Sequence, residues 1–169
     1  MTTTDPARLA LRQMAATLAY RAAKVLRDAP EAFGTQSFGG ATRQPVKIVA
    51  HMADLMTWGV SMAGGGKEWA PAGGDDWRTE VDRFFSGLAA LDATLNGDGE
   101  FKGSVDKLIQ GPLADALTHV GQLAMLRGMA GAPVKPESYA RAVITAGRVG
   151  LDQEAPRGEF SGDASEIRK

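Results

Sequence analysis

The predicted fold is built around the stretch Gly111–Ala130, GPLADALTHVGQLAMLRGMA. This stretch has the pattern of one amphipathic helix. Pro112 stands at the first turn, where a missing backbone N–H costs nothing. Asp115 and His119 are four residues apart, so we expect both side chains on one face of this helix, one turn apart.

Three other stretches are predicted helices, each with an apolar face and its own start and stop signals. No stretch has the alternating pattern of a strand. The sequence therefore predicts an all-α fold, a four-helix bundle. The first of these helices starts at Thr4-Asp5-Pro6 and runs through Asp28, and the second covers Val46–Met62. The third runs from Trp77 to about Leu95, with Asp75 or Asp76 as its N-cap.

The chain has 169 residues, which suits one domain with a substantial core. We expect the bundle to occupy residues 1–135. Residues 136–169 are predicted to form an extension that packs on the bundle or is partly disordered. Within it, Pro136–Ile144 is a candidate short helix, and Thr145–Lys169 is polar and rich in glycine and acidic residues.

The chain contains two histidines, and the second one, His51, lies in the helix predicted over Val46–Met62. An imidazole from this helix could meet Asp115 and His119 of the last helix, which is a common way to build a metal site in a bundle. Imidazole and carboxylate ligands suit zinc, nickel or ferrous iron, and three protein ligands leave positions open for water or substrate. The alternative is that the histidines are unrelated and that Asp115 is a first-turn acid favoured by the helix dipole.

Two neighbours of these residues are candidates for supporting roles. Asp54 lies one turn beyond His51 and could orient its ring, and Gln122 lies three residues after His119 and could bind a substrate or a water. The alternative is that both side chains brace neighbouring helices. Candidate walls of a pocket are the loop 33–44 and the region around Trp69.

Composition excludes several classes of function. The net charge of −1 offers no field for nucleic acid or an acidic membrane surface, and the absence of cysteine removes disulfides, thiol nucleophiles and Cys-type zinc fingers. No segment resembles a signal peptide or a membrane-spanning helix. We therefore expect a cytoplasmic protein with neither nucleic-acid nor membrane partners.

Taken together, the motifs resemble the DinB/YfiT-like family of metalloenzymes over most of residues 1–135. The segment His119-Val120-Gly121-Gln122-Leu123 is the most specific part of this resemblance. The quoted motifs are Val49-Ala50-His51-Met52-Ala53-Asp54-Leu55, then Trp77 followed by Arg83-Phe84-Phe85, and Asp115-Ala116-Leu117-Thr118-His119-Val120-Gly121-Gln122-Leu123.

The resemblance implies an up-down-down-up bundle with one long crossover and a divalent metal ion. In the family, one histidine from the second helix and a His-x-x-x-His pair from the fourth hold the metal. Here Asp115 stands at the first position of that pair, which is similar to the mycothiol-dependent isomerase branch, where a glutamate is found. Characterised members use the metal to activate a low-molecular-weight thiol.

The first hypothesis is therefore a metal-dependent enzyme that acts on a small-molecule substrate, a thiol-dependent S-transferase or a hydrolase. His51, Asp115 and His119 would hold the ion, and any thiol would come from a cofactor or substrate. The second hypothesis is a non-catalytic binding or stress-related bundle, with or without metal. The family resemblance and the alanine-rich first helix also lead us to expect a homodimer.

Overall fold

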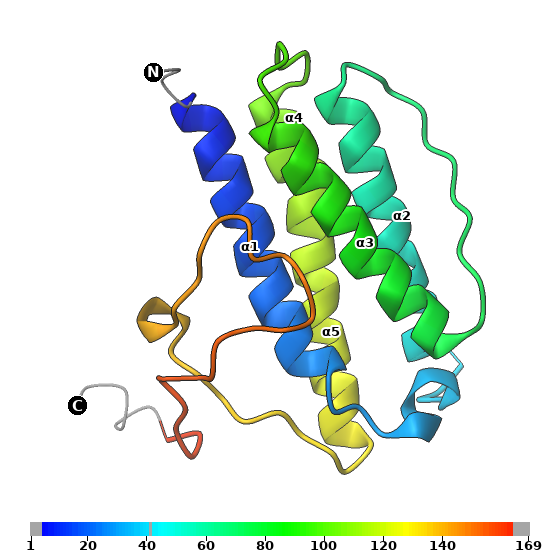
Figure 1. Ribbon diagram of the computed structural model, residues 1–169. Helices are drawn as coiled ribbons and strands as arrows, with labels where there is room; N and C mark the ends of the chain where they lie inside the picture. The colour runs from blue at the N-terminus through cyan, green and yellow to red at the C-terminus, as the bar shows by residue number, and fades with distance from the viewer. Residues whose placement is uncertain (1–4, 41, 164–169) are drawn as a thin grey trace.

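The computed structural model describes residues 5–40 and 42–163, and over these residues the protein is all-helical, with a single isolated bridge between Glu137 and Glu159. Four long helices lie side by side (Figure 1), so the predicted all-α class is confirmed. These helices are α1 Pro6–Leu26, α2 Pro45–Ala63, α3 Trp77–Asn96 and α5 Ala114–Met129; the short elements are η1 Glu31–Thr35, α4 Val105–Leu108, the π-helical turn η2 Ile109–Leu113 and η3 Tyr139–Arg141.

The helices begin where capping residues allow them to. Asp5 caps α1 by accepting a hydrogen bond from the backbone N–H of Ala7 at 2.9 Å. Of the two candidate caps for α3, Asp75 and Asp76, the structure has Asp76 as the N-cap. Its carboxylate accepts a hydrogen bond from the N–H of Thr79 at 2.8 Å. Each cap satisfies a backbone donor that the first turn leaves without a helical partner.

The core lies between the four long helices. α2 packs against α3 and α5, and α1 packs against the same two helices, so the four form a closed ring around the buried side chains. The contact of α2 with α3 is close: a Cβ added at Gly87 would lie 2.7 Å from the Cβ of Met56. The large side chains at its centre include Leu11, Leu18, Met52, Met56, Phe84, Leu88, Leu91 and Leu123.

The prediction of one helix over Gly111–Ala130 is wrong at its beginning. Helical structure does start at Val105, in agreement with the one or two turns that the sequence predicts over Ser104–Gln110. It is interrupted at Gly111, whose φ of −89° and ψ of −107° are not helical. Because Pro112 lies inside this run, its ring and missing N–H break the regular hydrogen-bond ladder, and the chain makes a π-helical turn instead. The regular helix α5 then starts at Ala114, directly before Asp115.

Two long segments cover the outside of the helices. Residues 64–76 connect the end of α2 to the start of α3 along the length of the molecule (Figure 1). After α5 the chain returns to α1, where the buried side chain of Glu137 accepts hydrogen bonds from Tyr20 and Lys24. The candidate helix over Pro136–Ile144 is wrong, since only Tyr139–Arg141 forms a 3₁₀ turn there.

The expectation of disorder at the end of the chain concerns residues 164–169, which lie outside the described residues. Among the helices of the described part, none combines the length and apolarity that a membrane span requires.

Candidate metal centre

His51, Asp115 and His119 meet between α2 and α5. Nε2 of His51 lies 3.4 Å from Oδ2 of Asp115, and Nε2 of His119 lies 3.3 Å from Oδ1 of the same carboxylate. One ligand atom of each residue lies within 4.8 Å of the other two. The two imidazole rings cross nearly at right angles, with centroids 5.0 Å apart. The sequence pattern predicted that these side chains would meet, and the structure brings them together.

These distances suit a divalent cation. A tetrahedral ion at about 2.1 Å from each ligand keeps neighbouring ligand atoms about 3.4 Å apart. The separations of 3.4 and 3.3 Å run from the two imidazoles to different oxygens of Asp115, so the carboxylate faces both rings. The separations are long for direct hydrogen bonds, which for nitrogen and oxygen lie near 2.9 Å. The three residues are therefore close enough to share one ion.

Gln122 determines which nitrogen of His119 faces the carboxylate. Oε1 of Gln122 lies 2.7 Å from Nδ1 of His119. In the tautomer that donates from Nδ1 to this amide oxygen, a neutral ring has its lone pair on Nε2, opposite Asp115. A lone pair and a carboxylate repel each other unless a cation or a proton lies between them. This arrangement is typical of a histidine that is held ready for a metal ion.

The centre is open to solvent on one side. The side chain of His119 is 13% exposed and that of His51 26%, while that of Asp115 is 45% exposed. Two hollows reach the centre: one of about 460 Å³ that both histidines line, and one of about 440 Å³ that His51 lines. A small molecule can therefore approach the two imidazoles directly.

Two tryptophans lie beside His51. The ring of Trp69 lies edge-on to that of His51, with centroids 5.8 Å apart, and Trp58 lies edge-on to Trp69 at 5.6 Å. The indole N–H of Trp58 is buried and has no hydrogen-bond partner among the described residues. The region around Trp69, which we expected to form a pocket wall, does so through Pro71, Ala72 and Gly73, which line the smaller hollow, while Trp69 itself lies beside His51.

The loop 33–44 contributes less to the site than we expected. Phe33 is 1% exposed and packs in the core against Phe38 and Trp77, with ring centroids 6.1 and 5.6 Å away. Its role is to anchor the loop between α1 and α2. The part of this loop that lines the hollows is its end, Thr42 and Arg43.

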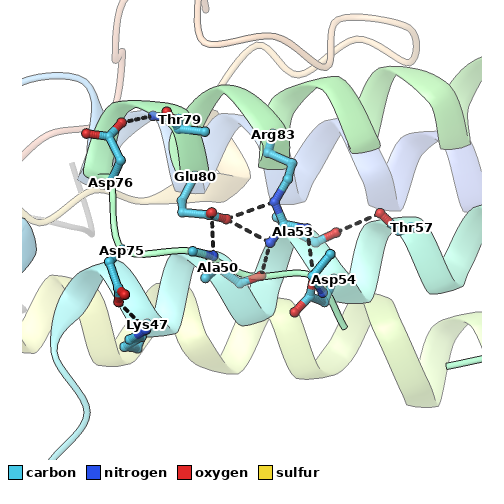
Figure 2. A network of polar contacts seen from close by, with 12 residues as sticks. Lys47, Ala50, Ala53, Asp54, Thr57, Asp75, Asp76, Thr79, Glu80 and Arg83 are labelled. Atoms are coloured by element: carbon cyan, nitrogen blue, oxygen red, sulfur yellow. Dashed lines mark hydrogen bonds and ion pairs between the residues drawn. The ribbon is translucent and has the colours of Figure 1, made fainter. Parts of the chain in front are cut away.

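Asp54 has partners other than the one that the sequence suggested. Figure 2 shows its carboxylate beside Arg83, which donates from Nη1 to Oδ1 at 2.6 Å. The same oxygen accepts from the backbone N–H of Ala72 at 3.0 Å. These are its hydrogen bonds among the described residues, and neither goes to the ring of His51. Asp54 therefore fixes the 64–76 connection and α3 to α2.

Arg83 is the centre of this network, a role that the motif Arg83-Phe84-Phe85 did not predict. It also donates to Glu80 at 2.8 Å and to the carbonyl of Ala50 at 2.9 Å, and Glu80 accepts from the backbone N–H of Gly74 (Figure 2). Burial acts against the charge on Arg83, but the hydrogen bonds to both carboxylates outweigh it and raise its pKa. Opposite charges three residues apart beside the apolar stripe of α3 were the available signal.

Comparison of the chain with protein-family models, with curated proteins and with solved structures finds no match. The geometry of the site therefore carries the functional argument.

Proposed function

We propose that this protein is a metal-dependent enzyme of the DinB/YfiT-like kind and that His51, Asp115 and His119 hold a divalent cation. The observation that carries the proposal is the grouping of these three side chains, one ligand atom of each lying within 4.8 Å of the other two. The length of the 64–76 connection fits the crossover of the up-down-down-up topology that the resemblance implies.

The residues of the site fit a catalytic role better than a structural one. Three ligands leave coordination positions open, and the exposed side of Asp115 leaves room for a small substrate. When bound, zinc, nickel or iron would polarise a substrate group or favour the ionised form of a thiol or water. Because the chain has no cysteine, the thiol of an S-transferase reaction would belong to a cofactor or substrate.

The test is the metal content of protein purified without a histidine tag. We expect about one ion per chain in the wild type and in Thr118→Ala, a variant on the exposed side of the same helix, and none in His119→Ala. Absence of metal in the wild type, even after incubation with zinc, nickel and iron, would overturn the metal site and with it the proposed function.

If the metal is present, a screen of thiol cofactors and of hydrolysable substrates follows. Activity that disappears with a chelator and returns on addition of the metal would support the enzyme. Activity that survives both His51→Ala and His119→Ala would contradict it.

A further inference from the structure

The two hollows beside the candidate metal centre share two side chains, His51 and Arg43. Arg43 comes from the end of the loop before α2, two positions ahead of Pro45, where that helix begins. The larger hollow is completed by both polar and apolar groups. They are Thr42, Ile48, His119, Gln122 and Met125.

Charges that line these hollows are paired, with one exception. Lys47 forms an ion pair with Asp75, and Asp54 forms one with Arg83. Among the residues that the structure describes, nothing forms a hydrogen bond or ion pair with the side chain of Arg43. Its guanidinium is therefore the one lining cation that is free to bind a ligand.

The chemistry of the larger hollow indicates the shape of that ligand. A guanidinium binds a carboxylate through two parallel hydrogen bonds, more specifically than an ammonium can. The apolar side chains of Ile48 and Met125 line the same space and suit a hydrocarbon body. His51 and His119 line it too, so a molecule that fills the hollow reaches the metal ligands.

We infer that the substrate is a small organic carboxylate, whose charged group is bound by Arg43 while its reacting end lies at His51 and His119. This inference rests on the proposed function, because it assigns a substrate class to the same site. Arg43 positions the substrate and takes no part in the bond changes.

The test uses probes that separate binding at the metal from binding at Arg43. Aliphatic hydroxamates attach to the metal by one end, and the other end carries either a carboxylate or the neutral amide. Pairs with short, medium and long chains are titrated calorimetrically into the zinc-loaded protein. We expect the best acid to bind about tenfold tighter than its amide. This preference should disappear in Arg43→Gln and remain in Arg78→Gln, which changes an arginine remote from the hollows, with zinc content unchanged in both.

The outcomes distinguish this inference from the proposed function. Equal affinity for acid and amide at every chain length, or a preference that persists in Arg43→Gln, would overturn the role of Arg43 and leave the metal site standing. If the protein takes up no zinc, the proposed function fails. The same pairs on the metal-free protein then decide the inference: an acid preference that depends on Arg43 supports it, and its absence overturns it.

Discussion

We predict that the hydrogen bond between Gln122 and His119 strengthens metal binding. Without an acceptor at Nδ1, the ring of His119 loses both its orientation and its preference for the tautomer with Nε2 free. We expect Gln122→Leu to weaken zinc binding by about tenfold or more, measured by competition with a chelating indicator. Gln122→Glu, which keeps an acceptor, should bind zinc nearly as well as the wild type. Equal affinity in wild type and Gln122→Leu would contradict this role.

We predict that Arg83 contributes to the stability of the fold rather than to ligand binding. The carboxylates of Asp54 and Glu80, with side chains only 7% and 4% exposed, depend on it for their charge balance. We expect Arg83→Met to lower the free energy of unfolding by about 3 kcal/mol, measured by urea denaturation, because it leaves two buried acids unpaired.

The matched control for this loss is Arg78→Met on the same helix. The Arg78 side chain is 84% exposed, and its nearest acid, Glu31, lies 3.9 Å away. Its replacement should change the unfolding free energy by less than about 0.5 kcal/mol. Similar losses in both variants would show that the network contributes no special stability.

These residues also show which side-chain contacts could be predicted from the sequence and which could not. The i, i+4 spacing of Asp115 and His119 fixes their common face on any helix, so it predicted their approach. The partner of Asp54 was not predictable in the same way. Arg83 lies 29 positions away, and the pair forms only because α2 and α3 pack closely enough to bury both charges.

Among the secondary-structure elements, the interruption of the helix before α5 could not be predicted from the residues around Pro112 alone. Proline at a first turn and proline inside a helix have the same sequence signature when the preceding residues can also be helical. Val105–Leu108 supplies that preceding helix, so Pro112 falls inside a longer helical run and forces a π-helical turn. The turn lies just ahead of Asp115, so it sets the direction in which the first candidate metal ligand of α5 points.

The close approach of α2 and α3 yields a pair of opposite predictions for glycine. A methyl group at Gly87 would lie 2.7 Å from the Cβ of Met56, whereas one at Gly121 would meet nothing within 4 Å. We expect Gly87→Ala to destabilise the protein by about 1–3 kcal/mol, because the helices must separate. Gly121→Ala should stabilise it by about 0.5–1 kcal/mol through helix propensity alone.

Chemical denaturation of both variants measures these changes. Stabilisation by Gly87→Ala would mean that the two helices approach less closely than the structure has them. The comparison is informative because both glycines lie in helix interiors, so the propensity gain is the same and the difference reports the packing.

At the scale of the whole molecule, the segment after α5 is tied to α1 by a buried polar group. The phenol of Tyr20, 2% exposed, donates to Glu137 at 2.8 Å, and Lys24 donates to the same carboxylate at 2.7 Å. The sequence predicted that this extension would pack on the bundle or be partly disordered. It could not show which charges hold it, because Tyr20 and Glu137 are 117 positions apart.

This attachment predicts a stability that depends on alkaline pH. Burial and the hydrogen bond to Glu137 raise the pKa of Tyr20 well above its ordinary range. Because the unfolded chain then releases the proton first, the contribution of Tyr20 is complete below about pH 10 and is lost as the pH rises above it. We expect the wild type to lose more than about 1 kcal/mol of unfolding free energy between about pH 9 and pH 11.5.

The Tyr20→Phe variant separates the phenol from the rest of the fold. It should be less stable than the wild type at neutral pH and lose less stability over the alkaline range, measured by urea denaturation at each pH. Lys24, whose pKa is raised by hydrogen bonds to Glu137 and Glu159 against the effect of burial, adds a loss of stability at alkaline pH in both proteins. Tyr139→Phe is the matched control, because it removes the other tyrosine and keeps the Tyr20–Glu137 bond. Parallel pH curves for wild type and Tyr20→Phe would show that Glu137 holds the segment without the phenol.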